Sequence, residues 1–316
     1  MTDTNGDFSS NTERKSYYLF VVAAACLVAV FLPTHKAAEN DLYREVLGET
    51  TIRQFPIAEK AGPVLLAEAR AFDIKAKSAL AVDVRTRAIL YQKNSQLHWP
   101  TASLAKLMTA LVISNITPQE AIVTVMSEDL KVSQPVMGLT VGEKIRVSDL
   151  LKGMLVMSAN DAANVLARSA TGSTERFVDM MNLMAQKLGL QNTHFKNPAG
   201  FDDPEQYSTA EDLLTLTYEF LRNSKFADIV QTQLEQVAST DGVHTHDLRT
   251  SNRLLEKNNI LGVKTGYTEG AKGNLILLAS DDSNNQIITV VLGSENREDD
   301  SMSLVDWVFK SYEYVK

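Results

Sequence analysis

Ser103 and Lys106 lie three residues apart in the stretch TASLAKLMTALV, residues 101–112. The apolar residues in this stretch predict a helix, and on a helix positions three apart are neighbours on the surface. A serine hydroxyl is a weak nucleophile unless a base takes its proton. A lysine amine can be that base if burial and a nearby positive charge depress its pKa. The pair indicates nucleophilic catalysis, although a capping serine beside a surface lysine would give the same spacing.

Two later stretches carry further residues that recur in nucleophilic enzymes. MSAND, residues 157–161, holds Ser158 and Asn160 in a predicted turn between two helices. LGVKTGYTEG, residues 261–270, holds Lys-Thr-Gly in a predicted strand that precedes a hairpin partner. Each triplet alone is weak evidence, because short motifs arise by chance. Only their combination with the first pair can decide between catalysis and ordinary structure.

Strand patterns open and close the region that begins near residue 64. Residues 79–84 and 88–92 predict a hairpin, and residues 274–280 and 286–293 predict a second pair of strands joined by a polar turn. Helical patterns occupy the chain between them. This order favours an antiparallel sheet with a helical insertion over a doubly wound parallel sheet.

The helical patterns carry recognisable start and stop signals. Ser148 is the predicted N-cap of a helix over 147–157, and Ser173 and Gly189 bound a helix whose methionine stripe predicts core packing. STAE, residues 208–211, predicts a capping box before another helix. A last helix follows the strands, and its apolar side is formed by Leu304, Trp307, Val308 and Tyr312.

Composition excludes several classes of protein. The chain has 316 residues, 44% of them hydrophobic, which is enough for a full globular core. Its formal net charge is -8 and no Lys/Arg-rich block occurs, which argues against a nucleic-acid partner. Cys26 is the single cysteine, so no intrachain disulfide can form.

The amino-terminal region predicts a membrane anchor. Tyr17–Leu32 runs 16 residues without a charge, near the lower limit for a bilayer-spanning helix. The predicted organisation is a cytoplasmic tail (1–15), a transmembrane anchor (16–33), a juxtamembrane linker (34–62) and an extracytoplasmic catalytic domain (63–316). A cleaved signal peptide followed by secretion is the alternative.

In the order Ser-x-x-Lys, Ser-x-Asn, Lys-Thr-Gly, the three motifs resemble those of the penicillin-binding serine acyltransferases, a superfamily that includes β-lactamases. Longer stretches, among them NTHFKNPAGFDDPEQYSTAEDL, make residues from about 64 to 313 similar to the low-molecular-mass D-alanyl-D-alanine carboxypeptidases. The resemblance implies an α/β fold of the α+β type, β-lactamase/transpeptidase-like, with an antiparallel sheet flanked by helices and a helical subdomain.

The resemblance also implies roles for individual residues. Ser103 would attack the carbonyl of the penultimate D-alanine, Lys106 would be its general base, and Ser158 would relay a proton toward the leaving amine. Backbone N–H groups of Ser103 and Tyr267 would form the oxyanion hole. The other predicted substrate-binding residues are Asn160, Lys264, Thr265, Gly266, Arg249 and Arg297. The two arginines and Thr265 would hold the terminal carboxylate.

The function implied is a serine-type peptidase that removes the terminal D-alanine from peptidoglycan stem peptides, with β-lactams as covalent inhibitors and no cofactor. The alternatives are a D,D-endopeptidase that cuts cross-links, a β-lactamase, and a noncatalytic wall-binding protein. A class A β-lactamase would need a deacylating glutamate, and neither Glu205 nor Glu211 stands in a suitable pattern. No metal site is predicted, because the spacing of His244 and His246 is wrong for one helix face.

Overall fold

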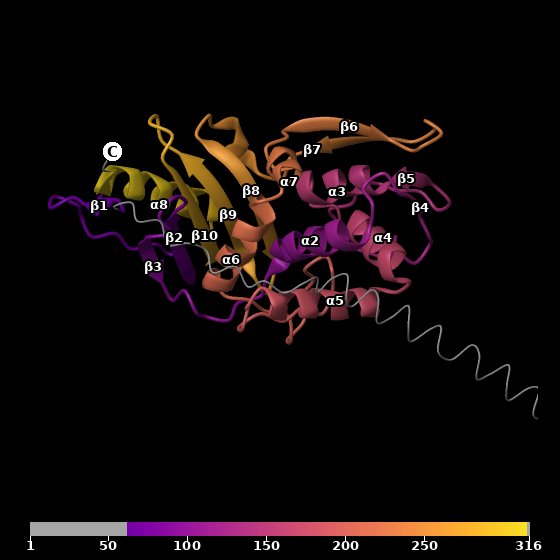
Figure 1. Ribbon diagram of the computed structural model, residues 1–316, viewed down its shortest axis with the longest axis horizontal. Helices are drawn as coiled ribbons and strands as arrows, with labels where there is room; N and C mark the ends of the chain where they lie inside the picture. Colours follow the sequence, from indigo (N-terminus) through magenta and orange to yellow (C-terminus); the bar gives the residue numbers. More distant parts are fainter. Residues whose placement is uncertain (1–61, 315–316) are drawn as a thin grey trace, which may run out of the picture. The chain divides into compact units, whose positions relative to one another are not determined.

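The structure, a computed structural model, describes residues 62–314. Its centre is a five-stranded sheet in which every neighbouring pair of strands is antiparallel (Figure 1). The spatial order of the strands is β3 (Ile89–Lys93), β2 (Ser78–Asp83), β10 (Gln286–Ser294), β9 (Lys272–Ser280) and β8 (Ile260–Thr268). The antiparallel sheet and both predicted hairpins are therefore confirmed.

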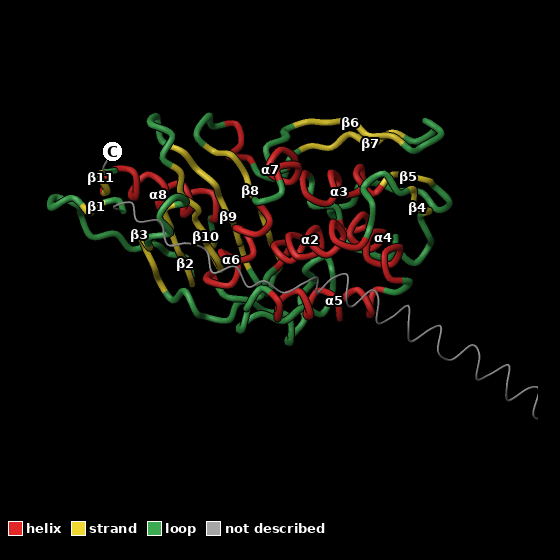
Figure 2. The backbone as a smooth tube through the Cα atoms, in the orientation of Figure 1, coloured by secondary structure: helices red, strands yellow, loops and turns green. Residues whose placement is uncertain are grey.

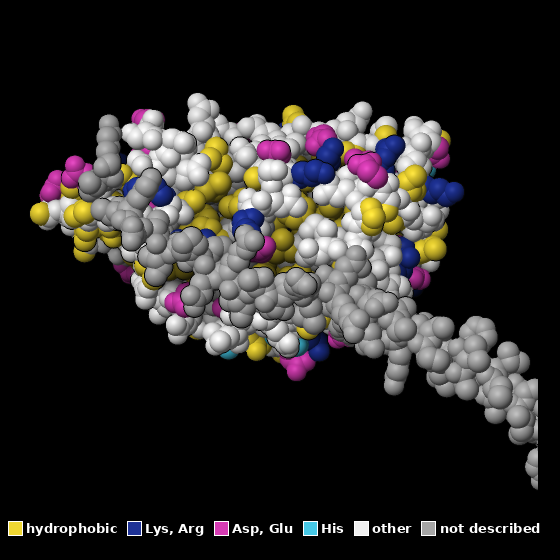
Figure 3. Space-filling model, in the orientation of Figure 1, with side chains coloured by type: hydrophobic (Ala, Val, Ile, Leu, Met, Phe, Trp, Pro, Cys, Tyr) yellow, Lys and Arg dark blue, Asp and Glu magenta, His cyan; other side chains and the backbone are white. Residues whose placement is uncertain are grey.

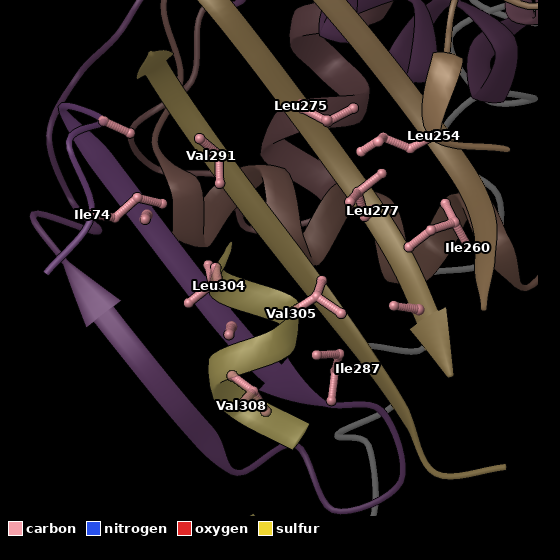
Figure 4. Packing of buried hydrophobic residues seen from close by; sticks show 14 of the residues in the cluster. Ile74, Leu254, Ile260, Leu275, Leu277, Ile287, Val291, Leu304, Val305 and Val308 are labelled. Atoms are coloured by element: carbon pink, nitrogen blue, oxygen red, sulfur yellow. The ribbon is translucent and has the colours of Figure 1, made fainter. Parts of the chain in front are cut away.

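The last long helix, α8 (Arg297–Ser311), covers one face of this sheet. Successive side chains of a strand point to opposite faces, so alternate residues of β2, β9 and β10 reach α8. Figure 4 shows Leu304, Val305 and Val308 of α8 pointing at Ile287 and Val291 of β10. The core between α8 and the sheet is therefore apolar, as the spacing of apolar residues in the last helix predicts.

Leu304 tests how much this packing contributes to stability. Its side chain is fully buried against the sheet, so Leu304→Ala leaves a cavity and is expected to lower the free energy of unfolding by about 2–5 kcal/mol. Urea denaturation measures the change. Leu97→Ala is the matched control because Leu97 is 39% exposed, and its effect should stay within about 0.5 kcal/mol. Equal losses in the two variants would contradict the assignment.

The opposite side of the sheet carries the helical part of the fold, which lies beside β8 in Figures 1 and 2. Its helices are α2 (Lys106–Ile116), α3 (Val147–Val156), α4 (Asn160–Thr171), α5 (Thr174–Lys187), α6 (Ala210–Leu221) and α7 (Ser224–Ile229). α2 runs through the middle, with every residue from Lys106 to Ile113 buried. The methionine stripe of α5 faces this core, as predicted, since Met180, Met181 and Met184 are buried.

Three two-stranded sheets complete the described chain. The pairs are β1 (Val64–Leu65) with β11 (Tyr312–Glu313), β4 (Ile122–Thr124) with β5 (Lys144–Arg146), and β6 (Leu234–Ala238) with β7 (Thr245–Arg249). Two short 3₁₀ helices, η1 (Ala102–Ala105) and η2 (Arg253–Glu256), stand before α2 and β8. On the face in Figure 3, acidic and basic side chains are interspersed over the described surface rather than separated by sign.

Among residues 62–314, no helix has both the length and the apolar character needed to cross a bilayer. The predicted tail, transmembrane segment (16–33) and nearly all of the predicted linker lie outside the described residues. The boundary predicted at residue 63 stays a prediction.

Two predicted helix starts are wrong by one or two residues. Arg146, not Ser148, is the N-cap of α3. The first N–H groups of this helix have no partner within the helix, but they donate to the carbonyls of Ala121 and Gln119 and therefore need no side-chain cap. Thr209, not Ser208, caps α6 by accepting from Asp212 N–H. Ser208 is held in an extended bridge with Trp99, so the helix cannot start there.

Candidate active site

The 3₁₀ turn η1 holds the predicted nucleophile next to its predicted base. Ser103 lies within η1, and Lys106 is the first residue of α2. In a 3₁₀ helix residues three apart lie on the same side of the turn, one directly above the other. Ser103 Oγ and Lys106 Nζ are accordingly 2.8 Å apart. The sequence predicted an ordinary helix here, and the tighter turn brings the same two side chains together.

Lys106 is enclosed by hydrogen-bond acceptors. Its side chain has no exposed surface, and Nζ donates to Asn160 Oδ1 at 2.8 Å and to the Ala199 carbonyl at 2.6 Å. Burial and, to a smaller extent, the charge of Lys264 hold the pKa of Lys106 well below its usual value, while Asp161 opposes the shift. A lysine with a lowered pKa can be neutral near pH 7 and accept the serine proton.

The second predicted lysine lies on the other side of the cleft, on β8. Lys264 is buried, and its Nζ donates to Ser158 Oγ at 2.8 Å. Burial, and next the charge of Arg297, lower the pKa of Lys264 to about 7. Ser158 has φ +67 in the turn between α3 and α4, a left-handed conformation that is rare outside glycine. Strained backbone of this kind clusters at functional sites.

β8 approaches the 3₁₀ turn closely at Gly266. A Cβ atom built there would lie 3.0 Å from Ala102 Cβ and 3.1 Å from Ser103 N, so a side chain would push the strand away from the nucleophile. One residue earlier, Thr265 is buried and its Oγ1 lies 2.7 Å from Ser251 Oγ. One residue later, Tyr267 is 56% exposed at the rim, where its hydroxyl donates to Glu269.

The two predicted carboxylate-binding arginines differ in their surroundings. Arg297 donates from Nη1 to the Gly266 carbonyl at 2.8 Å and from Nε to Glu298 at 2.9 Å, so it is fixed beside the Lys-Thr-Gly strand. Arg249 is exposed at the end of β7 and lines the same cavity as Arg297. The structure therefore brings Arg297 against the motif residues and leaves Arg249 at their edge.

Sequence reasoning missed two groups that hold these residues in place. The carboxylate of Asp161 accepts from three successive N–H groups, those of Met137, Gly138 and Leu139, and so fixes a loop over the Ser-x-Asn turn. Asn160 joins the same loop, since its Nδ2 donates to the Ser133 carbonyl. The acidic residue directly after Ser-x-Asn was a visible signal, but its loop partner is more than twenty residues away.

The second missed group is the turn that presents the Ala199 carbonyl to Lys106. Asn197 Oδ1 accepts from the N–H groups of Gly200 at 2.7 Å and Phe201 at 2.9 Å, which closes the turn. Gln206, buried below it, accepts from Asn197 N–H and donates to the Phe201 carbonyl. The Asn-Pro-x-Gly sequence was a readable turn signal, but its role beside the lysine was not.

The two histidines weighed as metal ligands are in different surroundings. His246 is buried, with Nε2 2.7 Å from Glu143 Oε1 and Nδ1 3.2 Å from the Met137 carbonyl. His244 is only partly buried. Within residues 62–314 no three His, Cys, Asp or Glu side chains are grouped as metal ligands. His246 instead ties β7 to the loop that Asp161 holds.

The sequence pattern of the peptidase family S11, described as D-alanyl-D-alanine carboxypeptidase, matches residues 65–296. The chain belongs to this family. The resemblance noted from the three motifs is thus confirmed. The residues of these motifs are the ones that the structure brings together around Ser103.

Individual relatives agree with this assignment. The S11 chain is 35% identical over 253 residues to D-alanyl-D-alanine carboxypeptidase DacF of Bacillus subtilis, covering 76% of the chain and 63% of DacF. It is 32% identical to DacA of Haemophilus influenzae, covering 77% and 64%. The matched region thus spans less than two thirds of these curated relatives.

Solved structures confirm the penicillin-binding, transpeptidase-like fold of the S11 chain. A mutant of the Streptomyces K15 DD-transpeptidase superposes with a TM-score of 0.70 at 29% identity, covering 76% of this chain and all of the other. Penicillin-binding protein 5 from Haemophilus influenzae gives a TM-score of 0.70 at 30% identity, covering 76% and 72%. The antiparallel sheet with its helical subdomain is the shared architecture.

Proposed function

We propose that this protein is a serine-type D-Ala-D-Ala carboxypeptidase that removes the terminal D-alanine from peptidoglycan stem peptides. One observation carries the proposal: the hydroxyl of Ser103 lies 2.8 Å from the amine of a fully buried lysine whose pKa is lowered. Family membership and the names of the relatives support it. β-Lactams would acylate the same serine, as substrate mimics.

In the proposed reaction, neutral Lys106 takes the proton of Ser103 as Oγ attacks the carbonyl of the penultimate D-alanine. The backbone N–H groups of Ser103 and Tyr267 would stabilise the negative oxygen of the tetrahedral intermediate. Ser158, whose hydroxyl accepts from Lys264, would pass a proton to the leaving amine as the C–N bond breaks. Water then cleaves the ester on Ser103, which releases the shortened peptide and the free hydroxyl.

The terminal carboxylate is the feature that distinguishes a carboxypeptidase substrate. Thr265, with its hydroxyl at the cleft side of β8, and Arg297 beside it would bind this group. A fixed guanidinium is well suited to a carboxylate because it offers several N–H donors in a plane. Asn160 would hold the amide of the substrate while its Oδ1 accepts from Lys106.

The surroundings of two glutamates disfavour the β-lactamase alternative. Glu211 accepts from Ser95 at 2.6 Å and from Gln96, and Glu205 pairs with Lys196 at 2.9 Å. These contacts occupy both carboxylates, that of Glu205 in the loop before α6 and that of Glu211 in the first turn of α6. We therefore assign neither of them a role in activating water. The D,D-endopeptidase alternative shares the acyl-enzyme chemistry and differs in the leaving group.

The location of the covalent adduct tests the proposal. Incubation with benzylpenicillin should add one penicilloyl group per chain, and peptide mapping by mass spectrometry should place it on Ser103. The protein should also release D-alanine from diacetyl-L-Lys-D-Ala-D-Ala. An adduct on another residue, or no adduct and no D-alanine, would refute the proposal. Rapid turnover of benzylpenicillin would support a β-lactamase instead.

We further propose that the apolar segment Tyr17–Leu32 anchors the protein in the cell membrane, with the catalytic domain on the extracytoplasmic side. The length of this uncharged segment supports a membrane span, and the proposed substrate lies outside the membrane. Secretion after signal-peptide cleavage is the competing outcome. Fractionation separates the two, because an uncleaved anchor leaves the intact chain in the membrane fraction.

A further inference from the structure

β8 is the edge strand of the five-stranded sheet on the side of the helical subdomain. Its pairing with β9 holds it from one side, and an edge strand leaves the backbone groups of its other side without a ladder partner. The N–H of Tyr267, the second proposed oxyanion donor, belongs to the penultimate residue of this strand. The position of this donor therefore depends on what else holds the end of β8.

Asp202 binds the end of β8 from outside the sheet. Its Oδ1 accepts from the hydroxyl of Thr268, the last residue of β8, at 2.6 Å, and its Oδ2 accepts from Gly270 N–H at 3.1 Å. Hydrogen bonds to a carboxylate are charge-assisted and stronger than those between neutral groups. A Cβ atom built on Gly270 would lie 3.0 Å from the carboxyl carbon of Asp202, so a glycine permits this close approach.

The hydroxyl of Thr268 also orders the turn that follows β8. Its Oγ1 accepts from Ala271 N–H at 2.9 Å, and the Ala271 carbonyl accepts from Trp99 Nε1 at 2.8 Å. Trp99 lies in the segment that leads into η1. Thr268 is therefore the middle of a series of contacts that runs from Asp202 to the segment before the nucleophile.

Asp202 is fixed by the turn that it follows. Both backbone groups of Phe201 are bonded, since its N–H donates to Asn197 Oδ1 at 2.9 Å and its carbonyl accepts from Gln206 Nε2 at 2.9 Å. Gln206 is buried, which restrains the residue before Asp202. This is the same turn whose carbonyl accepts from Lys106.

The turn and β8 both lie against Ala102 of η1. A Cβ atom built on Gly200 of the turn would lie 1.8 Å from the Ala102 carbonyl oxygen, and one built on Gly266 of β8 would lie 3.0 Å from Ala102 Cβ. Ser103 is the next residue, so its two neighbours across space are the turn and β8. Asp202 joins these two neighbours directly.

We propose that Asp202 is a positioning residue for the oxyanion hole, because it holds Thr268 and so keeps the N–H of Tyr267 where the negative oxygen forms. The inference rests on the proposed acyl-transfer function and adds a residue to it. One oxyanion donor contributes about 10²–10³-fold to the rate, and a misplacement of about 1 Å costs roughly 10²-fold. Asp202 acts through Thr268 and takes no part in the chemistry itself.

Asp202→Ala and Thr268→Val each remove the contact and test the inference on the full-length protein in detergent. Each variant is expected to slow the acylation of Ser103 by benzylpenicillin by about 10–100-fold per folded molecule. The double variant should react within about twofold of the slower single variant, because both changes remove one contact. Thr268→Ser keeps the hydroxyl and should restore most of the rate. Single variants within about threefold of the wild type, or multiplied losses in the double variant, would overturn the inference.

A boronic acid separates the oxyanion hole from the base. The probe is diacetyl-L-Lys joined to the boronic-acid analogue of D-alanine, in which boron replaces the carbonyl carbon. The oxygen of Ser103 donates a lone pair to boron and gives up its proton, and a hydroxyl on the tetrahedral boron occupies the oxyanion position. The inhibition constant for Asp202→Ala should rise by about the factor by which acylation slows.

The pH dependence of acylation by Asp202→Ala should remain that of the wild type, because Lys106 keeps its acceptors on Asn160 and Ala199. A shifted pH dependence would show that the contact acts on the base. That result, or an unchanged inhibition constant, would overturn the inference.

Asp282→Ala is the matched control. Asp282 is an exposed aspartate between β9 and β10, at the opposite end of β9 from Thr268, and its loss should change neither acylation nor inhibition. An equal loss in this variant would overturn the inference. If the wild type is acylated at Ser103 but the variants at Asp202 and Thr268 react as fast, only this inference is refuted. If the wild type neither is acylated nor releases D-alanine, the proposed function itself is refuted.

Discussion

A Lys106→Met variant is expected to react with benzylpenicillin about 10⁴-fold more slowly than the wild type, the upper end of what a general base contributes. Methionine keeps the length and the apolar stem of lysine but cannot accept the proton of Ser103. The hydroxyl then has no base within reach, since Nζ of Lys106 is the amine 2.8 Å from Oγ. The measurement is the second-order rate of adduct formation, followed by mass spectrometry.

The same variant should be as stable as the wild type at neutral pH, or more so. An unfolded lysine keeps a pKa near 10.4, whereas Lys106 in the fold has a pKa well below its usual value. Between these two values the unfolded state binds a proton that the folded state does not. The contribution of Lys106 to the stability of the wild type therefore rises with pH up to about 10.4, and Lys106→Met removes that contribution.

Urea denaturation at pH 6, 8 and 10 measures this slope, with Lys310→Met at an exposed lysine of α8 as the control. The control should keep both the wild-type slope and the wild-type acylation rate. Acylation by Lys106→Met within about tenfold of the wild-type rate would show that another group is the base. Parallel slopes for Lys106→Met and the wild type would show that Lys106 is not neutralised by folding.

The sequence predicted the contact between Ser103 and Lys106 because the relevant geometry is local. Ser103 and Lys106 lie within one turn, and any helix with about three residues per turn brings them together, so it did not matter that the turn is 3₁₀. The strands were predictable for a similar reason. The nearly continuous apolar runs of β2 and β10 are typical of strands buried on both faces, and this pattern is visible in the sequence.

The partners of these residues were not predictable, because they come from distant parts of the chain. The Ala199 carbonyl that accepts from Lys106 carries no side-chain signal, and it is 93 residues away. The loop that Asp161 holds is recognisable only when its three N–H groups are seen to converge on one carboxylate. The predicted cap at Ser148 failed in the same way, since carbonyls of another segment satisfy the helix start.

Burial of two lysines makes the site electrostatically unusual. Lys106 and Lys264 are almost without exposed surface, and the pKa of each is lowered mainly by that burial. Each amine is satisfied by neutral oxygen acceptors, those of Asn160, Ala199 and Ser158, rather than by a carboxylate. A bound carboxylate would have raised the pKa of either lysine again. These surroundings agree with the proposed role of Lys106 as the base, and the Ala199 carbonyl is one of the neutral acceptors.

Gly200→Ala is expected to lower the rate of acylation by about 100-fold or more, although the alanine side chain takes no part in chemistry. Gly200 has φ +93, and a Cβ atom there would lie 1.8 Å from the Ala102 carbonyl oxygen and 2.9 Å from Ser103 N. No side-chain rotation relieves a clash between a Cβ and backbone. Either the turn must move, taking the Ala199 carbonyl from Lys106, or η1 must move, taking Ser103 with it.

Gly172→Ala separates this clash from the strain of the left-handed backbone. Gly172 ends α4 with φ +83, and nothing lies within 4 Å of its built Cβ. Both variants therefore bear the left-handed strain of about 1–2 kcal/mol, which urea denaturation measures. Only Gly200→Ala should lose further stability. Only this variant should also show slower acylation of Ser103 by benzylpenicillin, measured per folded molecule. If the two variants acylate at the same rate, then contact between the turn and η1 does not position the nucleophile, and the lysine must be held by Asn160 alone.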